Sequence, residues 1–270
     1  MKILVTGATG HVGTHVVREL AASHDVIATG RTVIPHTSNR LTWQQADLAD
    51  ATPWPRLLED VDAAFLFPAF GHTQSFIDAA TETGLPKLVL LSSGAVSDVE
   101  DSMIKAVHAE IEDQALASRV PCVRVRPTAF MANDLAWLPA IRKGESVPLP
   151  YPHAAMPVVA EQDIAAVIAR CLTHDVDGDI YEVTGPRSLS QVERLQILAR
   201  HITDTDANWT DITDEAEQNG LPSMPGPPGE YLLRNLQRAA NVPVPPTREV
   251  PGLLGRSAMD YAAWAKATTR

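Results

Sequence analysis

Short apolar runs alternate with amphipathic stretches through the first half of the chain, a pattern typical of βαβ units that build a parallel sheet. Several runs are continuously apolar, as strands buried on both faces are. The runs predict six strands, at Ile3–Thr6, Val26–Thr29, Leu41–Gln45, Ala63–Phe67, Leu88–Ser92 and Cys122–Arg126. Apolar positions at helical spacing lie between them, at Val12, Val16, Val17 and Leu20 and at Ile104, Val107, Ile111 and Ala115. We expect an α/β fold with a doubly wound parallel sheet.

The pattern loosens after Asn133. Proline-rich connections interrupt it at Val147–Pro152, Leu221–Gly229 and Val242–Pro251. Helices are predicted at Glu161–Thr173, Leu189–Ile202, Tyr231–Ala240 and Met259–Ala267, and a further strand at Ile180–Val183. We expect a nucleotide-binding core over residues 1–135 and a smaller C-terminal, substrate-side cap over 136–270, with about 155–186 returning to the core.

The composition excludes several classes of protein. The 270 residues are 45% hydrophobic and carry a formal net charge of −11, which disfavours binding to nucleic acid or to an anionic membrane surface. The sequence has no apolar stretch long enough to span a membrane. It also has no His, Cys or Asp residues at the spacings typical of a metal site. The two cysteines do not form a disulfide framework, and a strand-like run directly follows Met1, which leaves no room for a signal peptide. We expect a cytoplasmic protein.

A glycine-rich loop joins the first predicted strand to the first helix. It reads Gly7-Ala8-Thr9-Gly10-His11-Val12-Gly13. Glycine lets the backbone turn sharply and approach a pyrophosphate closely, and the helix N-terminus favours the phosphate charge. In this βαβ context the loop predicts a dinucleotide site formed by Gly7, Thr9, Gly10, His11, Val12 and Gly13.

Two further positions bear on the cofactor. Arg31 follows the second strand, where an NAD-preferring site usually carries an acidic residue. A guanidinium can clamp a 2′-phosphate, so the position favours NADPH over NAD, although a solvated loop arginine is the alternative. Asp47 and Leu48 follow the third strand, where they can meet the adenine. A helix N-cap with a core leucine explains them equally well.

Two loops are expected at the nicotinamide, because they follow strands at the carboxyl edge of the sheet. One contains Phe67, Pro68, Phe70 and His72, and the other contains Phe130 and Asn133. Core packing explains Phe67 and Phe130 equally well. Phe70, His72 and Asn133 are therefore the hints of a site for a flat aromatic substrate, and Trp137 is a further candidate for the same cleft.

The chain resembles the atypical, NmrA-like branch of the short-chain dehydrogenase/reductase superfamily, a Rossmann-fold family that includes NADPH quinone reductases. The glycine loop carries the resemblance together with four later segments. These are Leu91–Val96, His108–Glu112 with Arg126–Asn133, Tyr181–Pro186, and Gly255-Arg256 with Tyr261 and Trp264. The resemblance implies an NAD(P)-binding protein whose cofactor also contacts Ser92 and Pro127.

The sequence departs from the superfamily at its catalytic pair. Ser93 matches the catalytic serine, but Ile104 stands at the position of the tyrosine and His108 at that of the lysine. Isoleucine transfers no proton, so Ser93 and His108 remain as candidate catalytic residues. Glu112 lies one turn beyond His108 and could orient its imidazole. A contact with the cofactor and a structural role rank ahead of proton transfer for His108.

These observations favour an NADPH-dependent reductase of a small aromatic or quinone-like compound, because hydride transfer to such an acceptor needs mainly proximity. One alternative is a non-catalytic sensor of NAD(P), in which Ile104 marks lost catalysis. Another is a biosynthetic enzyme that uses the fold for a non-redox step. A small-molecule partner is expected in the enzyme, and a homodimer or a protein partner if the chain is a regulator.

Overall fold

A computed structural model describes residues 1–32, 38–221 and 223–269. Seven parallel strands form one sheet in the order β3-β2-β1-β4-β5-β6-β9. The strands are β1 (Lys2–Val5), β2 (Asp25–Gly30), β3 (Leu41–Gln45), β4 (Ala63–Leu66), β5 (Leu88–Leu91), β6 (Cys122–Pro127) and β9 (Ile180–Val183). The strand order reverses beside β1, which places a crevice at the carboxyl ends of β1 and β4.

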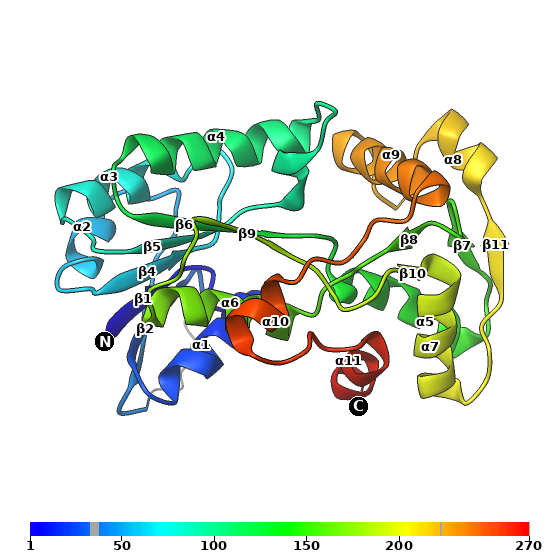
Figure 1. The fold of residues 1–270 in the computed structure, drawn as a ribbon, viewed down its shortest axis with the longest axis horizontal. Helices are drawn as coiled ribbons and strands as arrows, with labels where there is room; N and C mark the ends of the chain where they lie inside the picture. Colours follow the sequence, from blue (N-terminus) through cyan, green and yellow to red (C-terminus); the bar gives the residue numbers. More distant parts are fainter. Residues whose placement is uncertain (33–37, 222, 270) are drawn as a thin grey trace. The chain divides into compact units, whose positions relative to one another are not determined.

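Helices cover both faces of this sheet (Figure 1). On one face α1 (Gly13–Ala21) packs against α6 (Glu161–Thr173). The other face carries α2 (Trp54–Leu57), α3 (Gln74–Glu82) and α4 (Met103–Ala117). Its core includes the edge-to-face pair of Trp54 and Phe76, with ring centroids 5.1 Å apart. Burial on both faces explains why the central strands β4 and β5 are apolar throughout.

The described residues form two compact units. Unit 1 holds the sheet and comprises Met1–Val99, Lys105–Pro127 and Glu161–Val183. Unit 2 comprises Glu100–Ile104, Thr128–Ala160 and Thr184–Arg270. The sheet is completed only after the chain has visited unit 2, because β9 pairs with β6 through Val125 and Tyr181 among others.

Unit 2 combines short strands with helices. The strand pairs are β8 (Ala155–Met156) with β10 (Leu189–Ser190), and β7 (Val147–Leu149) with β11 (Trp209–Asp211). The helices are η2 (Met131–Trp137), α5 (Leu138–Lys143), α7 (Gln191–Thr203), α8 (Thr213–Asn219), α9 (Pro227–Asn241), α10 (Glu249–Leu254) and α11 (Tyr261–Thr268). A capping box between Ser190 and Glu193 starts α7. The helices α5 and α11 both pack on α7 around the buried Trp264.

The doubly wound sheet and its six expected strands are confirmed, and each observed strand end lies within one residue of the expected end. Predicted helix 189–202 is wrong at its start, because Leu189 and Ser190 pair with β8 before α7 begins. The helix expected at Tyr231 begins at Pro227, since proline is favoured in a first helical turn. Pro222 of the expected proline-rich connection lies outside the described residues.

Within the described residues, none of the helices has the length and apolar character needed to span a bilayer. Those residues also hold no group of three or more metal-ligating side chains. Cys122 and Cys171 are free thiols, and burial raises the pKa of each to about 12.

Candidate functional site

The glycine loop is closely folded at the end of β1. Gly7 has a φ of +60°, and its carbonyl oxygen accepts a hydrogen bond of 2.9 Å from the Gly10 amide. A Cβ atom at Gly13 would lie 2.1 Å from the same carbonyl oxygen, so this position admits only glycine. The loop and the first turn of α1 thus pack backbone against backbone.

The start of α1 suits an anion. The helix begins without a side-chain cap, and its first turn contains no acidic residue. The positive end of the helix dipole therefore faces the loop without a compensating carboxylate on that turn. Phe67 borders the loop, because its amide donates to the Thr6 hydroxyl at 2.7 Å and a Cβ atom at Gly7 would lie 2.9 Å from the Phe67 Cβ. This arrangement fits a bound pyrophosphate.

A cleft of about 410 Å³ opens at the carboxyl ends of β2 and β3. Its lining includes Arg31, Gln45, Asp47 and Asp50. The Gln45 amide donates to the Arg31 carbonyl at 3.1 Å, which fixes the backbone from which the exposed guanidinium extends. Asp47 closes a local turn by accepting from the Ala49 amide at 3.1 Å. The structure therefore brings Arg31 and Asp47 together at one cleft.

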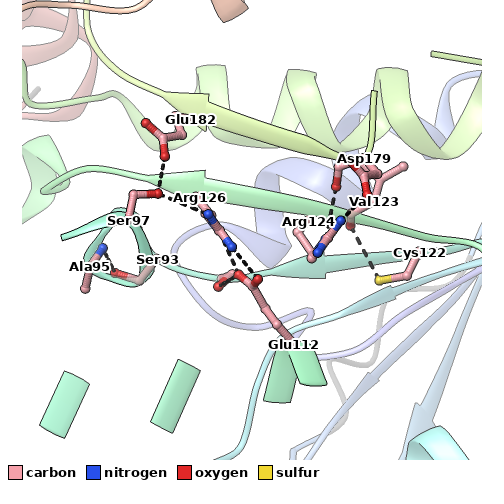
Figure 2. A network of polar contacts seen from close by, with 11 residues as sticks. Ser93, Ala95, Ser97, Glu112, Cys122, Val123, Arg124, Arg126, Asp179 and Glu182 are labelled. Carbon is pink, nitrogen blue, oxygen red and sulfur yellow. Dashed lines mark hydrogen bonds and ion pairs between the residues drawn. The ribbon is translucent and has the colours of Figure 1, made fainter. Parts of the chain in front are cut away.

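A buried ion pair lies behind the carboxyl ends of β5 and β6. Glu112 is 3% exposed and accepts from Arg126 through both carboxylate oxygens, at 2.8 Å from Nε and 2.5 Å from Nη2. The Ser92 hydroxyl donates to the same carboxylate at 2.5 Å. Figure 2 shows that Arg126 also donates a hydrogen bond to the Ser97 hydroxyl, which in turn donates to Glu182. The hydrogen bond from Arg126 to Glu112 raises the arginine pKa, so the guanidinium stays charged.

Glu112 therefore does not serve as the hydrogen-bonding partner that the helical spacing indicated for His108. Its oxygens contact Arg126 and Ser92, and a bidentate arginine is the stronger partner. His108 instead meets Phe70 edge to face, with ring centroids 5.1 Å apart. Burial lowers the pKa of His108, against a smaller opposing effect of the Glu112 charge. The imidazole is neutral at pH 7.

Ser93 caps the short helix η1 (Gly94–Ser97). Its hydroxyl oxygen accepts from the Ala95 amide at 3.2 Å, as Figure 2 shows. A serine hydroxyl in this role still has its hydrogen to donate. The capping contact fixes the side chain at the carboxyl edge of β5, which is where a substrate or cofactor carbonyl can use that hydrogen.

Unit 2 contains a cavity of about 450 Å³. One wall comes from η2 and α7 and carries Trp137, Asp134 and Arg194. Aliphatic and thioether side chains from β8, α8, α9 and the connection between the two helices line much of the rest. They include Met156, Leu221, Met224, Leu232 and Leu236.

The polar groups of the cavity wall are paired with one another. Arg194 Nε donates to Asp134 Oδ2 at 2.9 Å, and the Tyr261 hydroxyl donates to the same oxygen at 2.7 Å. The Arg194 guanidinium lies 5.7 Å from the centre of the Trp137 ring. Since Asp134 and Arg194 are 4% and 5% exposed, this wall is a rigid, electrically compensated support for the indole.

The predicted site residues divide between the two units. Unit 1 holds the glycine loop, Arg31, Asp47, Leu48, Phe67, Pro68, Phe70, His72, Ser92, Ser93, His108 and Pro127. Leu48 packs on the apolar core and is not among the residues that line the Arg31 cleft. Phe130, Asn133 and Trp137 line the cavity of unit 2 together. Phe130, expected at the cofactor, thus borders the same space as the two expected substrate residues.

Sequence reasoning missed Asp134, Gln191, Arg194 and Tyr261. A signal for two of them was present, because Gln191, Arg194, Leu195 and Leu198 share one face of α7 and all four are buried. Polar residues within an otherwise apolar helical stripe indicate a buried polar contact. Asp134 and Tyr261 gave no such signal, since they are brought to Arg194 from far along the chain.

Comparison with known proteins finds a match to a dinucleotide-binding family and similarity to named reductases. Residues 7–175 match the NAD(P)H-binding family. A (4-alkanoyl-5-oxo-2,5-dihydrofuran-3-yl)methyl phosphate reductase from Streptomyces griseus is 32% identical, with 97% of this chain and 96% of that protein covered. An NAD(P)H azoreductase from Xenophilus azovorans is 26% identical, with 98% and 97% covered.

The fold comparison extends over the whole chain. An NADPH-dependent quinone oxidoreductase from Escherichia coli, solved with NADPH, superposes with a TM-score of 0.80 at 19% identity, covering 99% of this chain and 100% of that one. The two chains thus share the Rossmann-type sheet and the smaller C-terminal portion. Because the family model matches more than half of the length of this chain, the chain belongs to the NAD(P)H-binding family.

Proposed function

We propose that the protein is an NADPH-dependent reductase of small conjugated carbonyl compounds, of which quinones and related aromatic acceptors are the model class. The glycine loop carries this proposal, because it packs tightly against the start of α1, where the helix has neither a side-chain cap nor an acidic residue in its first turn, and such a helix start suits a pyrophosphate. The 32% identical relative is named a reductase, which supports reduction as the reaction.

The proposed cofactor site uses the residues of unit 1. The loop from Gly7 to Gly13 holds the pyrophosphate through backbone amides. Arg31 holds the 2′-phosphate, and Asp47 accepts from the adenine amino group. Phe67 borders the loop from the end of β4 and is followed by Pro68. Ser92 and Pro127 lie at the ends of β5 and β6.

The preference for NADPH rests on direct contact with Arg31. Asp47 and Asp50 line the same cleft, so its described lining carries one cation and two carboxylates. The long-range attraction of this cleft for the 2′-phosphate is therefore weak. Discrimination between NADPH and NADH depends on paired hydrogen bonds from the guanidinium to the 2′-phosphate. The proposed preference is accordingly a property of one side chain.

The reaction needs little acid–base machinery. When bound, NADPH would supply the hydride, and one proton from water would complete the reduction of a quinone to a hydroquinone. Ser93 keeps its hydroxyl hydrogen available to donate to a carbonyl at the carboxyl edge of β5. His108 is neutral and half-buried against Phe70, so we assign it a positioning role beside the cofactor. Asn133 and Trp137 contact the substrate in the cavity of unit 2.

The test separates catalysis from sensing. Purified protein is titrated with NADPH and NADH by calorimetry, and NADPH oxidation is then followed with a panel of benzoquinones and naphthoquinones. The proposal predicts tighter binding of NADPH and quinone-dependent oxidation. Tight NADPH binding without oxidation of any acceptor would instead identify the chain as a dinucleotide sensor.

A further inference from the structure

The cavity of unit 2 has two chemically different walls. The wall from η2 and α7 presents the Trp137 ring beside the paired Arg194 and Asp134. The contribution from α8, α9 and their connection is mostly aliphatic, with Leu232 and Leu236 on one face of α9, and includes the polar Glu215 and Ser223. A ring that stacks on an indole and a flexible apolar chain match these two surfaces.

The single cation among the described lining residues is already neutralised. Arg194 directs Nε and Nη2 to the Asp134 carboxylate at 2.9 Å and 3.5 Å, and Nη1 to the Leu189 carbonyl at 3.4 Å. Asp134 is further held by Tyr261. Freeing the guanidinium for a ligand anion would leave the buried Asp134 carboxylate without its positive partner, which is strongly unfavourable.

Gln191 and Glu215 do not favour an anion either. Gln191 donates its side-chain amide to the carbonyls of Pro150 and Tyr151. Glu215 lines the cavity as a second carboxylate. One compensated cation against two carboxylates repels a phosphate group, although the 32% identical relative is named for a phosphate ester.

We infer that this cavity binds an uncharged conjugated carbonyl compound by its ring and its alkyl or acyl chain, and that it rejects the phosphorylated form of such a compound. The inference rests on the proposed function for the identity of the cavity as the substrate site. It concerns the class of ligand, which the family match does not specify.

Binding can be measured apart from turnover with redox-inert probes. Alkyl 4-hydroxybenzoates from methyl to octyl carry an uncharged ring, a conjugated carbonyl and a graded chain. Calorimetry should show the dissociation constant falling roughly fourfold per added methylene until the cavity is filled. An affinity that does not change with chain length would overturn the inference.

Neighbouring residues on α9 provide a matched pair of variants. Leu232 lines this cavity, whereas Leu233 lines an adjoining cleft of about 460 Å³ beside α8, which shares Leu221 and Met224 with the cavity. Both side chains are half-buried. Leu232→Ala should weaken binding of the octyl ester about tenfold and flatten the chain-length series. Leu233→Ala should leave the series as in the native protein, and equal effects of the two changes would contradict the assignment of the cavity.

Charge selection is tested with 6-hydroxyhexyl 4-hydroxybenzoate and its phosphate monoester. The phosphate ester should bind at least about tenfold more weakly than the alcohol. Glu215→Gln should narrow this gap, while Asp214→Asn, an exposed neighbour outside the cavity lining, should not. Equal or tighter binding of the phosphate ester would show that the cavity accepts anions and that the inference is wrong.

Unsubstituted 1,4-benzoquinone separates this inference from the proposed function. Its reduction by NADPH tests the reductase proposal without any alkyl chain. Chain-dependent probe binding with no quinone reduction would sustain the ligand class and contradict the reductase. Quinone reduction together with probe binding that does not depend on alkyl chain length would sustain the reductase and contradict the ligand class.

Discussion

The substitution Gly13→Ala tests the glycine loop at its tightest point. The added Cβ atom would lie 2.1 Å from the Gly7 carbonyl oxygen, 2.8 Å from the Gly7 carbonyl carbon and 2.9 Å from the Ala8 Cα. All three are backbone atoms, so no side-chain rotation relieves the clash. The loop and the first turn of α1 must therefore separate by roughly 1 Å before an ordinary contact is reached.

This displacement sets the expected magnitude. A backbone amide that loses a charge-assisted hydrogen bond to phosphate gives up about 1.5–3 kcal/mol. Loss of one or two such bonds raises the dissociation constant for NADPH by about 100-fold. Overpacking adds a stability loss of about 1–3 kcal/mol, so the variant remains folded while its affinity falls.

Calorimetric titration with NADPH measures the affinity, and urea denaturation measures the free energy of unfolding. The control is Gly252→Ala within α10, where an added Cβ meets no heavy atom within 4 Å. This control should bind NADPH as the native protein does and gain roughly 0.5–1 kcal/mol of stability, because alanine favours the helix. Native NADPH affinity in Gly13→Ala would refute the assignment of the loop.

Three further predictions concern cofactor choice, catalysis and pH. Arg31→Ala should remove most of the preference for NADPH over NADH, worth about 1.5–3 kcal/mol. Calorimetry at low and high salt should show that the preference of the native protein weakens with salt. Equal affinities of the native protein for NADPH and NADH would exclude the role of Arg31. Ser93→Ala and His108→Ala should each lower the quinone reduction rate by roughly 100-fold or less, and a much larger loss at His108 with NADPH affinity preserved would identify it as the principal acid. Burial lowers the pKa of His108 from 6.5, so the unfolded chain takes up this proton first as the pH falls. The contribution of neutral His108 to the free energy of unfolding is complete above pH 6.5 and is lost as the pH falls toward the lowered pKa. Urea denaturation at pH 7.5 and 5.5 should show a smaller loss of stability between the two pH values in His108→Gln than in the native protein. The same loss in both proteins would contradict the burial effect.

The sheet was predictable because its strands carry a strong local signal. Val89 and its neighbours in β5 form a continuous apolar run, as do the residues of β4. The glycine loop was equally readable, since its spacing and its place between a strand and a helix follow from one local stretch of sequence. These features depend on neighbours in the chain and not on distant partners.

The short strands of unit 2 were not predictable in the same way. The two-residue strand β8 and the three-residue strands β7 and β11 are too short for a period to show. Their partners are also remote, as in the pairing of Trp209 with Val147. Tertiary packing, and not local pattern, determines these strands.

The polar contacts show the same division. The spacing of His108 and Glu112 placed them on one helix face, but Arg126 arrives from β6 and takes the carboxylate in a bidentate pair. The Asp134–Arg194 pair likewise joins segments sixty residues apart. Partners of this kind depend on the three-dimensional fold, and the helical period alone cannot select among them.

The stoichiometry of NADPH oxidation under anaerobic conditions decides whether the protein reduces a quinone with NADPH bound at the glycine loop. The protein is mixed with NADPH and 1,4-benzoquinone, and hydroquinone is quantified beside NADP⁺, with Gly13→Ala and Gly252→Ala measured in parallel. We expect one hydroquinone per NADPH oxidised, a rate retained in Gly252→Ala, and a rate strongly reduced in Gly13→Ala at subsaturating NADPH. Oxidation no faster than in protein-free solution, or oxidation that Gly13→Ala leaves unchanged, would contradict a reductase that works through this loop.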